Sequence, residues 1–179
     1  MKAAILLANG FEDTEALTTR DILLRSRELG VSLITINHDL IVEASSGLKV
    51  IADLKLEEAK FEDYDFLILP GGKRGVSNLN ADERVIALIR EYKKAGKPVY
   101  AICAAPSILG KLGYLEGKSY TCYPGFETAK GYTGKGVSID GDTITGKAMF
   151  FSIDFGLAIL EKHLGKEVAD RVKSGARGD

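Results

Sequence analysis

Short apolar runs alternate with amphipathic stretches along most of the chain. Uninterrupted apolar residues are typical of parallel strands covered on both faces. An amphipathic helix is predicted over 81–95, because apolar residues recur there at helical spacing: Val85, Leu88, Ile89 and Tyr92. The alternation predicts a mostly parallel α/β sheet with helices on both faces, joined by right-handed crossovers. The strands are expected at 2–8, 31–37, 66–69 and 99–102, and a further helix from Phe11 to about Leu29, ended by Gly30.

The remaining segments predict smaller elements. Residues 40–44 and 48–52 flank Ser-Ser-Gly and predict an antiparallel hairpin beside the main sheet. Asp140-Gly141, within 137–145, predicts a second hairpin with a type I′ turn. The other expected elements are one or two helical turns at 56–60, a short strand at 119–123, a helical stretch at 125–130, a helix at 150–163, and a last short helix around Val168 and Val172 with a frayed tail from Ser174.

Composition narrows the class of protein. A chain of 179 residues with 45% hydrophobic and 27% charged residues suits one soluble globular domain, expected to span 1–179. The net charge of −1 predicts no nucleic acid partner and no anionic membrane partner. Two cysteines and two histidines give neither a disulfide framework nor a metal-binding spacing, so neither a metal nor a cofactor is expected. The N-terminus has no signal-peptide pattern, and we expect a cytoplasmic protein.

Cys103 stands between a predicted strand and a predicted helix. The strand 99–102 ends at Cys103, and Pro106 suits the first turn of the following helix. Such a turn is where an open α/β sheet presents its site, and unpaired helix N–H groups nearby favour a thiolate. A small buried thiol that fills a gap in the core is the other interpretation of this window, because free cysteines are often buried.

Two other predicted loops lie at the same edge of the sheet. Glu15 follows the first strand, and Gly71-Gly72 follows the third. A buried, protonated Glu15 would donate a hydrogen bond to sulfur. A solvated, ionised Glu15 would only interact favourably with the positive end of the helix dipole. The N–H groups of Gly72 and Ala104 would bind an oxyanion. Gly71 and Gly72 also suit an ordinary turn.

The sequence offers Cys103 no obvious histidine base. The next residue is Ala104, and His38 and His163 are expected at the surface. Tyr123 follows a predicted strand and precedes Pro124, so it is a candidate wall of the cleft. Cys122 is expected to be a core thiol.

Four motifs over nearly the whole chain resemble the DJ-1/PfpI (ThiJ) superfamily, within it the DJ-1 branch with its YajL-like bacterial members. Three of them are Gly10-Phe-Glu-Asp-Thr-Glu15, Leu69-Pro-Gly-Gly72 and Ala101-Ile-Cys-Ala-Ala-Pro106. The fourth is Ile153-Asp-Phe-Gly-Leu-Ala158 followed by Gly165-Lys-Glu-Val168. The run through Cys103 is the most specific of the four.

The resemblance implies a flavodoxin-like three-layer sandwich that forms a homodimer, with Arg25 near its interface. It also implies that Cys103 is an easily oxidised nucleophile and that Glu15 is a protonated partner of its thiolate. Gly72 and Ala104 would be the backbone donors around the sulfur. Activities reported in the family include glutathione-independent glyoxalase, deglycation of methylglyoxal adducts, redox-dependent chaperoning and, in another branch, proteolysis.

The chain departs from the family pattern at three places. Tyr123 stands where many members have histidine. Gly146-Lys-Ala-Met-Phe150 replaces a Gly-Pro-Gly-Thr stretch, and Ser46 replaces an arginine of some relatives. From these changes we expect a site without histidine-assisted proton transfer, one pocket wall of different shape and charge, and weaker stabilisation of a sulfinate.

We expect a thiol enzyme in which Cys103 attacks reactive α-oxoaldehydes or their adducts, Glu15 moves a proton, and Gly72 and Ala104 hold the oxyanion. The alternative is a non-catalytic redox sensor or chaperone that responds through oxidation of Cys103. Ala104, in place of the histidine typical of the protease branch, argues against proteolysis.

Overall fold

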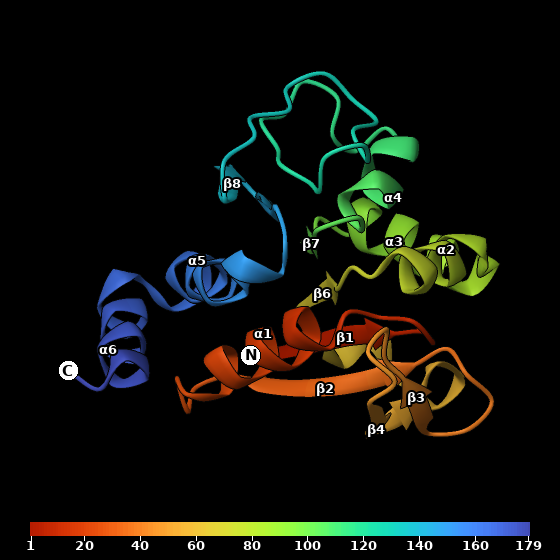
Figure 1. Ribbon diagram of the computed structural model, residues 1–179, viewed down its shortest axis with the longest axis horizontal. Coiled ribbons are helices and arrows are strands. Elements are labelled where there is room, and N and C mark those ends of the chain that lie inside the picture. Colours follow the sequence, from red (N-terminus) through yellow and green to blue (C-terminus); the bar gives the residue numbers. More distant parts are fainter.

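A seven-stranded sheet separates two layers of helices in the computed structural model, which describes all residues 1–179 (Figure 1). The strand order is β5-β2-β1-β6-β7-β9-β8, and every pair is parallel except β8 with β9. The strands are β1 (Lys2–Leu7), β2 (Gly30–Thr35), β5 (Leu54–Lys55), β6 (Phe66–Leu69), β7 (Val99–Ile102), β8 (Val137–Asp140) and β9 (Thr143–Gly146). A separate antiparallel hairpin pairs β3 (Ile41–Glu43) with β4 (Lys49–Ile51).

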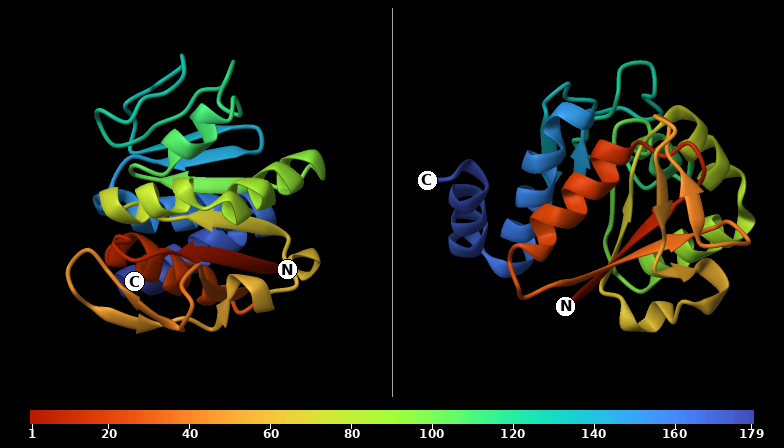
Figure 2. Two further views of the ribbon diagram at one scale, coloured as in Figure 1. Left: turned by 90° about the vertical axis from the view of Figure 1, so that its right-hand side faces the viewer. Right: turned by 60° about the horizontal axis from the view of Figure 1, so that its bottom comes forward.

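The helices lie on both faces of the sheet, as the flavodoxin-like three-layer fold requires (Figure 2). One layer contains α1 (Asp13–Leu24), α5 (Ser152–Leu164) and α6 (Lys166–Arg177). The other contains α2 (Lys73–Ala81), α3 (Glu83–Lys94) and α4 (Pro106–Lys111). Short 3₁₀ turns are η1 (Leu56–Glu58), η2 (Phe61–Asp63) and η3 (Met149–Phe151). No helix is long and apolar enough to cross a membrane.

Strand β1 contributes side chains to two hydrophobic cores, one on each face of the sheet. Successive side chains of a strand point to opposite faces. Ala3, Ile5 and Leu7 therefore join the core shared with α1 and α5, while Ala4 and Leu6 join the core under α2, α3 and α4. All five are fully buried, which explains why the strand reads as an unbroken apolar run.

The strands predicted at 2–8, 31–37, 66–69 and 99–102, both hairpins and the helix over 81–95 are confirmed apart from shifts at their ends. The helix expected to reach Leu29 ends at Leu24, and Arg27 takes the left-handed conformation (φ 61°) that a glycine usually supplies. Gly30 then begins β2 instead of ending the helix. In the second hairpin Asp140 pairs with Thr143, so the turn is Gly141-Asp142 rather than Asp140-Gly141. Of these two turn residues only Gly141 has a positive φ. A type I′ turn requires a positive φ at both, so this turn is not of type I′.

Two predictions for the 112–136 segment are wrong. The strand expected at 119–123 is reduced to one isolated bridge between Tyr120 and Tyr132. The stretch 125–130 is not helical, because its backbone bonds elsewhere. The Tyr120 hydroxyl accepts the N–H groups of Thr128 (3.2 Å) and Ala129 (3.1 Å), which would otherwise bond within a helix.

Helix α2 and strand β5 were not predicted. The inner face of α2 carries only two apolar side chains, Val76 and Leu79, in a short stretch that is otherwise polar, so too few apolar residues mark it in the sequence. Strand β5 has only two residues and pairs with β2 at the edge of the sheet. The tail expected to fray from Ser174 continues as α6 to Arg177, where Gly178 caps it in the left-handed conformation.

Candidate active site

Cys103 is held at the end of β7 in a left-handed backbone conformation (φ 64°). Its N–H donates to the carbonyl of Gly146 (2.9 Å), and its carbonyl accepts the N–H of Tyr123 (2.7 Å). A left-handed residue with a side chain costs roughly 1–2 kcal/mol. Both backbone bonds fix the conformation, so the surrounding loops hold this strain in place.

Glu15 lies in the first turn of α1 and is only 1% exposed. Its Oε2 accepts the N–H of Gly71 (2.7 Å), whereas its Oε1 is buried without a partner. Burial raises the pKa of this carboxyl to about 7, against the opposing effects of Cys103 and of the Gly71 N–H. The helix end is fixed by Glu12, whose carboxylate accepts the N–H of Glu15 (2.7 Å).

Gly71 occupies the space between the acid and the thiol. A Cβ at this position would lie 2.5 Å from Oε2 of Glu15 and 2.6 Å from Cβ of Cys103. It would also lie 3.1 Å from Sγ of Cys103. Glycine is therefore required for the close approach of the three loops. Sequence separation is no obstacle, because all three loops follow parallel strands and meet at one edge of the sheet.

The thiol of Cys103 is half-buried. Burial raises its pKa to about 12, and so does the negative charge of Glu15, while the N–H groups of Gly72 and Ala104 act in the opposite direction. The N–H groups thus favour the thiolate as expected, but burial and an ionised Glu15 outweigh them, so the net thiol pKa is raised. A protonated Glu15 carries no charge and exerts no repulsion on a thiolate.

This arrangement can move one proton between two adjacent groups. Above about pH 7 the Glu15 carboxylate is available to accept the thiol proton as sulfur attacks an electrophile. The protonated acid then has a proton to return. The N–H groups of Gly72 and Ala104 face the sulfur and are suited to an oxyanion formed beside it.

Tyr123, the predicted wall residue of the cleft, borders this site through its backbone. Its N–H bonds to Cys103, its side chain is 48% exposed, and its ring packs edge-on against Phe126 at 6.4 Å between centroids. Ser46 is engaged elsewhere, because its hydroxyl donates to Asp13 (2.6 Å).

The altered stretch 146–150 reaches the site at one end only. Gly146 ends β9 and accepts the N–H of Cys103. Phe150, in contrast, is 82% exposed.

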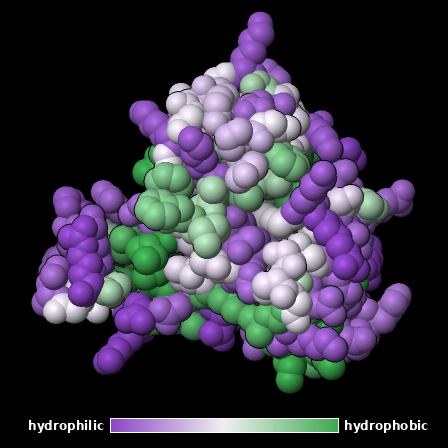
Figure 3. Space-filling view, in the orientation of Figure 1, coloured by the Kyte–Doolittle hydropathy of each residue, from purple (hydrophilic) through white to green (hydrophobic).

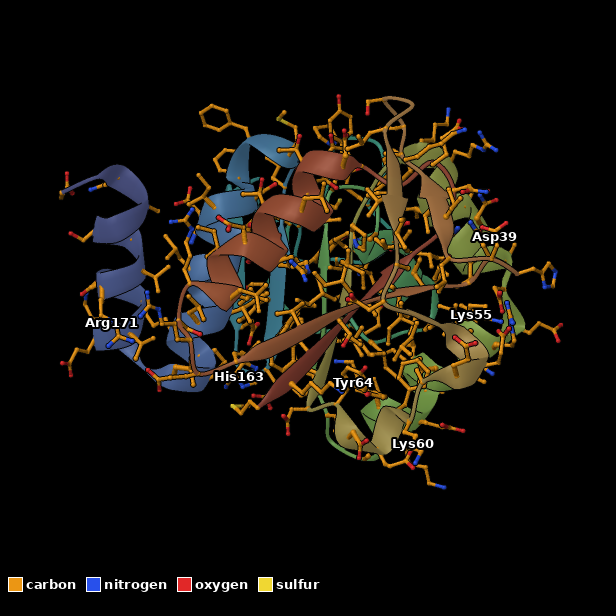
Figure 4. The ribbon with its side chains drawn as sticks, turned by 90° about the horizontal axis from the view of Figure 1, so that it is seen from below. Asp39, Lys55, Lys60, Tyr64, His163 and Arg171 are labelled. Carbon is orange, nitrogen blue, oxygen red and sulfur yellow. The ribbon has the colours of Figure 1, made fainter.

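Arg25 does not belong to this cluster. It caps α1 ten residues after Glu15, which is about 15 Å along a helix. There its guanidinium bonds to Asp21 (2.7 Å) and lines an open groove against α6. Arg171 of α6 lines the same groove and is labelled in Figure 4.

Neither histidine is placed to serve Cys103. His38 is exposed as expected, but His163 is half-buried, which the sequence did not predict. Its ring stacks on Phe66 (4.3 Å between centroids) and its Nε2 lies 2.9 Å from the Tyr100 hydroxyl. His163, labelled in Figure 4, therefore lies at Phe66, where β6 begins, whereas Cys103 follows the opposite end of the neighbouring parallel strand β7. Cys122 is fully buried, as expected of a core thiol.

Two residues that position the site were not identified as such from the sequence. Gly146 fixes the Cys103 amide, and Glu12 caps the helix that carries Glu15. The sequence marks Gly146 only as a glycine after a Thr-Ile-Thr strand, and Glu12 only as an acid three residues before Glu15. Both patterns are too common to identify a positioning residue.

The chain matches known proteins along most of its length. Residues 1–162 match the model of the DJ-1/PfpI family. Protein DJ-1 homolog B of Arabidopsis thaliana is 33% identical over 165 residues, which are 90% of this chain and 37% of that protein. The chain therefore spans little more than a third of the length of this relative.

Two further matches extend over both chains almost completely. Protein dj-1beta of Drosophila melanogaster is 32% identical over 178 residues, covering 97% of this chain and 95% of that protein. The structure described as oxidized DJ-1 of Toxoplasma gondii superposes with a TM-score of 0.91 at 27% identity, covering 98% and 97% of the two chains.

Proposed function

The chain belongs to the DJ-1/PfpI family, and we propose that it is a cysteine-dependent enzyme that converts reactive α-oxoaldehydes, free or as adducts, through Cys103. The observation that carries the proposal is the contact between the loops of Glu15, Gly71 and Cys103. It sets a nucleophile at a strained turn beside a buried acid with a pKa of about 7. A structural thiol would need neither the acid nor the strain.

With methylglyoxal the first step forms a bond between Sγ of Cys103 and the aldehyde carbon. The thiol proton passes to Glu15, and the aldehyde oxygen becomes an oxyanion that faces the N–H groups of Gly72 and Ala104. Glu15 then returns its proton to this oxygen and completes the hemithioacetal.

In the second step Glu15 moves the proton on the former aldehyde carbon to the neighbouring ketone carbon. The hydroxyl proton of the hemithioacetal passes to the ketone oxygen. The aldehyde carbon is oxidised and the ketone carbon is reduced within one molecule, so no external oxidant is required. The product is a thioester of a 2-hydroxy acid, and water hydrolyses it to lactate and the free thiol.

The test is the formation of lactate from methylglyoxal by the wild type, by Cys103→Ala and by Cys122→Ala. We expect lactate from the wild type and from Cys122→Ala, which keeps the reactive thiol, and none from Cys103→Ala. Disappearance of methylglyoxal is a poor measure, because lysine and arginine side chains also consume it. Lactate formed at the same rate by all three proteins would refute the proposal.

A redox sensor or chaperone is the second candidate, favoured by the half-exposed Cys103 thiol beside two backbone donors. These donors would stabilise sulfinate oxygens, and one structural relative is described as oxidized. Intact-mass spectra after mild peroxide distinguish the candidates. A stable gain of two oxygens at Cys103, in a protein that makes no lactate, would favour the sensor.

We further propose that the protein is a homodimer in a reducing cytoplasm, where Cys103 and Cys122 stay unpaired. Exposed apolar side chains support self-association, because monomers rarely leave such patches open. They include Phe150 and Ile153 near the start of α5 and Ile51 on β4. Figure 3 shows apolar surface around α5 and the β3–β4 hairpin. Analytical ultracentrifugation of the wild type and Ile153→Glu tests the proposal, with a monomeric wild type as the contrary result.

A further inference from the structure

A cavity of about 350 Å³ lies beside the Cys103 site, on the face of the sheet covered by α2 and α4. Its walls are Lys73, Val76, Ser77 and Asn80 of α2, Ser107 and Lys111 of α4, and residues 125–128. The volume lies within the range of roughly 300–1,000 Å³ typical of small-molecule sites. Methylglyoxal has five non-hydrogen atoms and would leave most of such a cavity empty.

Each wall of this cavity continues directly from a group at the Cys103 site. Lys73 follows Gly72, whose N–H faces the thiol. Ser107 lies three residues after Ala104 and bonds to its carbonyl (2.7 Å). Phe126 packs against Tyr123, which bonds to the Cys103 carbonyl. The cavity and the Cys103 site are therefore built on the same three loops, which places the cavity next to a molecule bound at Cys103.

The chemistry of the walls favours a negative charge. Lys73 and Lys111 form no ion pair and no side-chain hydrogen bond in the structure, although several other surface lysines do. The only acidic wall residue is Glu127, and both of its oxygens accept the N–H of Gly125 (3.1 and 2.9 Å). Two lysines against one glutamate leave the lining with a charge of +1.

Uncharged donors complete the lining. The hydroxyls of Ser77 and Thr128 and the amide of Asn80 have no hydrogen-bond partner in the protein, so they are free to bind a ligand. The hydroxyl of Ser107 already donates to Ala104 and would only accept. Phe126 supplies one apolar wall.

From these contacts we infer that the cavity is a subsite for the anionic tail of the molecule on which Cys103 acts, a carboxylate or a phosphate, joined to the reacting carbonyl through an apolar spacer. The nature of the reacting end rests on the proposed α-oxoaldehyde chemistry. The charge of the tail rests on Lys73, Lys111 and the free donors alone.

Phenylglyoxal and 4-carboxyphenylglyoxal form a matched pair of substrates that differ by one anionic tail. We expect the wild type to have a kcat/KM about 1.5–5 times higher for the carboxylated aldehyde, a ratio typical of exposed charge pairs. The ratio should fall to about one in the double variant Lys73→Gln/Lys111→Gln. Lys173→Gln, at an exposed lysine on α6, should keep the wild-type ratio.

Binding without turnover separates this inference from the proposed function. Cys103→Ala cannot form the hemithioacetal. In NMR titrations of this variant with mandelate and 4-carboxymandelate, the corresponding 2-hydroxy acids, the difference between the two ligands therefore reports on the tail carboxylate alone. We expect tighter binding of 4-carboxymandelate, with shifts at the amides of Lys73, Ser77, Lys111 and Thr128. A phosphonate in place of the tail carboxylate shows which anion binds more tightly.

Equal affinity for mandelate and 4-carboxymandelate, or shifts confined to residues outside the cavity, would overturn the subsite even if methylglyoxal is converted to lactate. Selective binding by a protein that converts no aldehyde would instead preserve the subsite and refute the proposed reaction.

Discussion

The backbone N–H of Gly71 donates to Oε2 of Glu15 over 2.7 Å, between two residues 56 positions apart. This bond satisfies one carboxyl oxygen and leaves the other, Oε1, buried without a partner. A neutral acid tolerates this environment better than a carboxylate, because an unpaired buried charge is costly. Burial therefore raises the pKa of Glu15, although the Gly71 N–H acts in the opposite direction. The close approach of both side chains to Gly71 places this acid beside Cys103.

Gly71→Ala should damage the site more than the fold. The new methyl group would overlap Glu15 and Cys103, and we expect a loss of about 1–3 kcal/mol in unfolding free energy, as for other overpacked sites. Alkylation of Cys103 and lactate formation should both decrease strongly. Gly175→Ala is the matched control, because a Cβ there meets nothing within 4 Å. If Gly71→Ala keeps wild-type stability and reactivity, the close approach of the three loops is wrong.

Glu15 should make the protein less stable as the pH rises. The pKa of Glu15 is about 7 in the folded protein and has an ordinary value of 4.5, so between these values the folded state holds the extra proton. Its contribution to stability is complete below pH 4.5 and is lost by about pH 7, a decrease of roughly 3 kcal/mol at most. Urea unfolding at several pH values measures it.

Glu15→Gln serves as the comparison for this pH dependence. Its amide oxygen still accepts the Gly71 N–H, and it has no proton to lose. Its stability should therefore lack the Glu15 decrease between pH 4.5 and 7. Identical pH profiles for the two proteins would show that Glu15 has an unshifted pKa.

The reactivity of Cys103 should follow the ionisation of Glu15. Iodoacetamide alkylation should accelerate as the pH passes through about 7, where the Glu15 carboxylate becomes available to accept the thiol proton. In Glu15→Gln this rise should disappear, and only the direct ionisation of the thiol should remain. Glu15→Asp should show a smaller rise of the alkylation rate with pH, since its shorter side chain places the carboxyl group farther from the thiol. A single titration near pH 8.5 in all three proteins would instead indicate an ordinary free thiol.

The strain at Cys103 is measurable without any substrate. Cys103→Gly should be more stable than Cys103→Ala by about 1 kcal/mol, because only glycine adopts positive φ without steric cost. At an ordinary position the order is reversed, since glycine increases the entropy of the unfolded chain. Thermal unfolding of both variants decides the matter. Alanine as the more stable residue would exclude the left-handed conformation.

Much of the fold could be predicted because it rests on local pattern. The apolar runs of β1, β6 and β7 are long enough to identify buried strands, and the spacing of Val85, Leu88 and Ile89 identifies α3. Helix α2 was missed because this local pattern is short there: its burial depends on only two apolar side chains. The stretch 125–130 failed because the Tyr120 hydroxyl takes the N–H groups that a helix would have used.

For this protein, the sequence by itself determined which residues are candidates: Cys103 after a buried strand, Glu15 in a first helical turn and Gly71-Gly72 after another strand. The order of parallel strands then implied a common edge. Only the tertiary structure decided that Glu15 is buried, that Gly71 bonds to its carboxyl, and that Gly146 and Tyr123 hold Cys103 at positive φ. The reason is physical: burial, pKa and backbone strain come from contacts between distant segments, whereas the sequence pattern reports only the local preference of each segment.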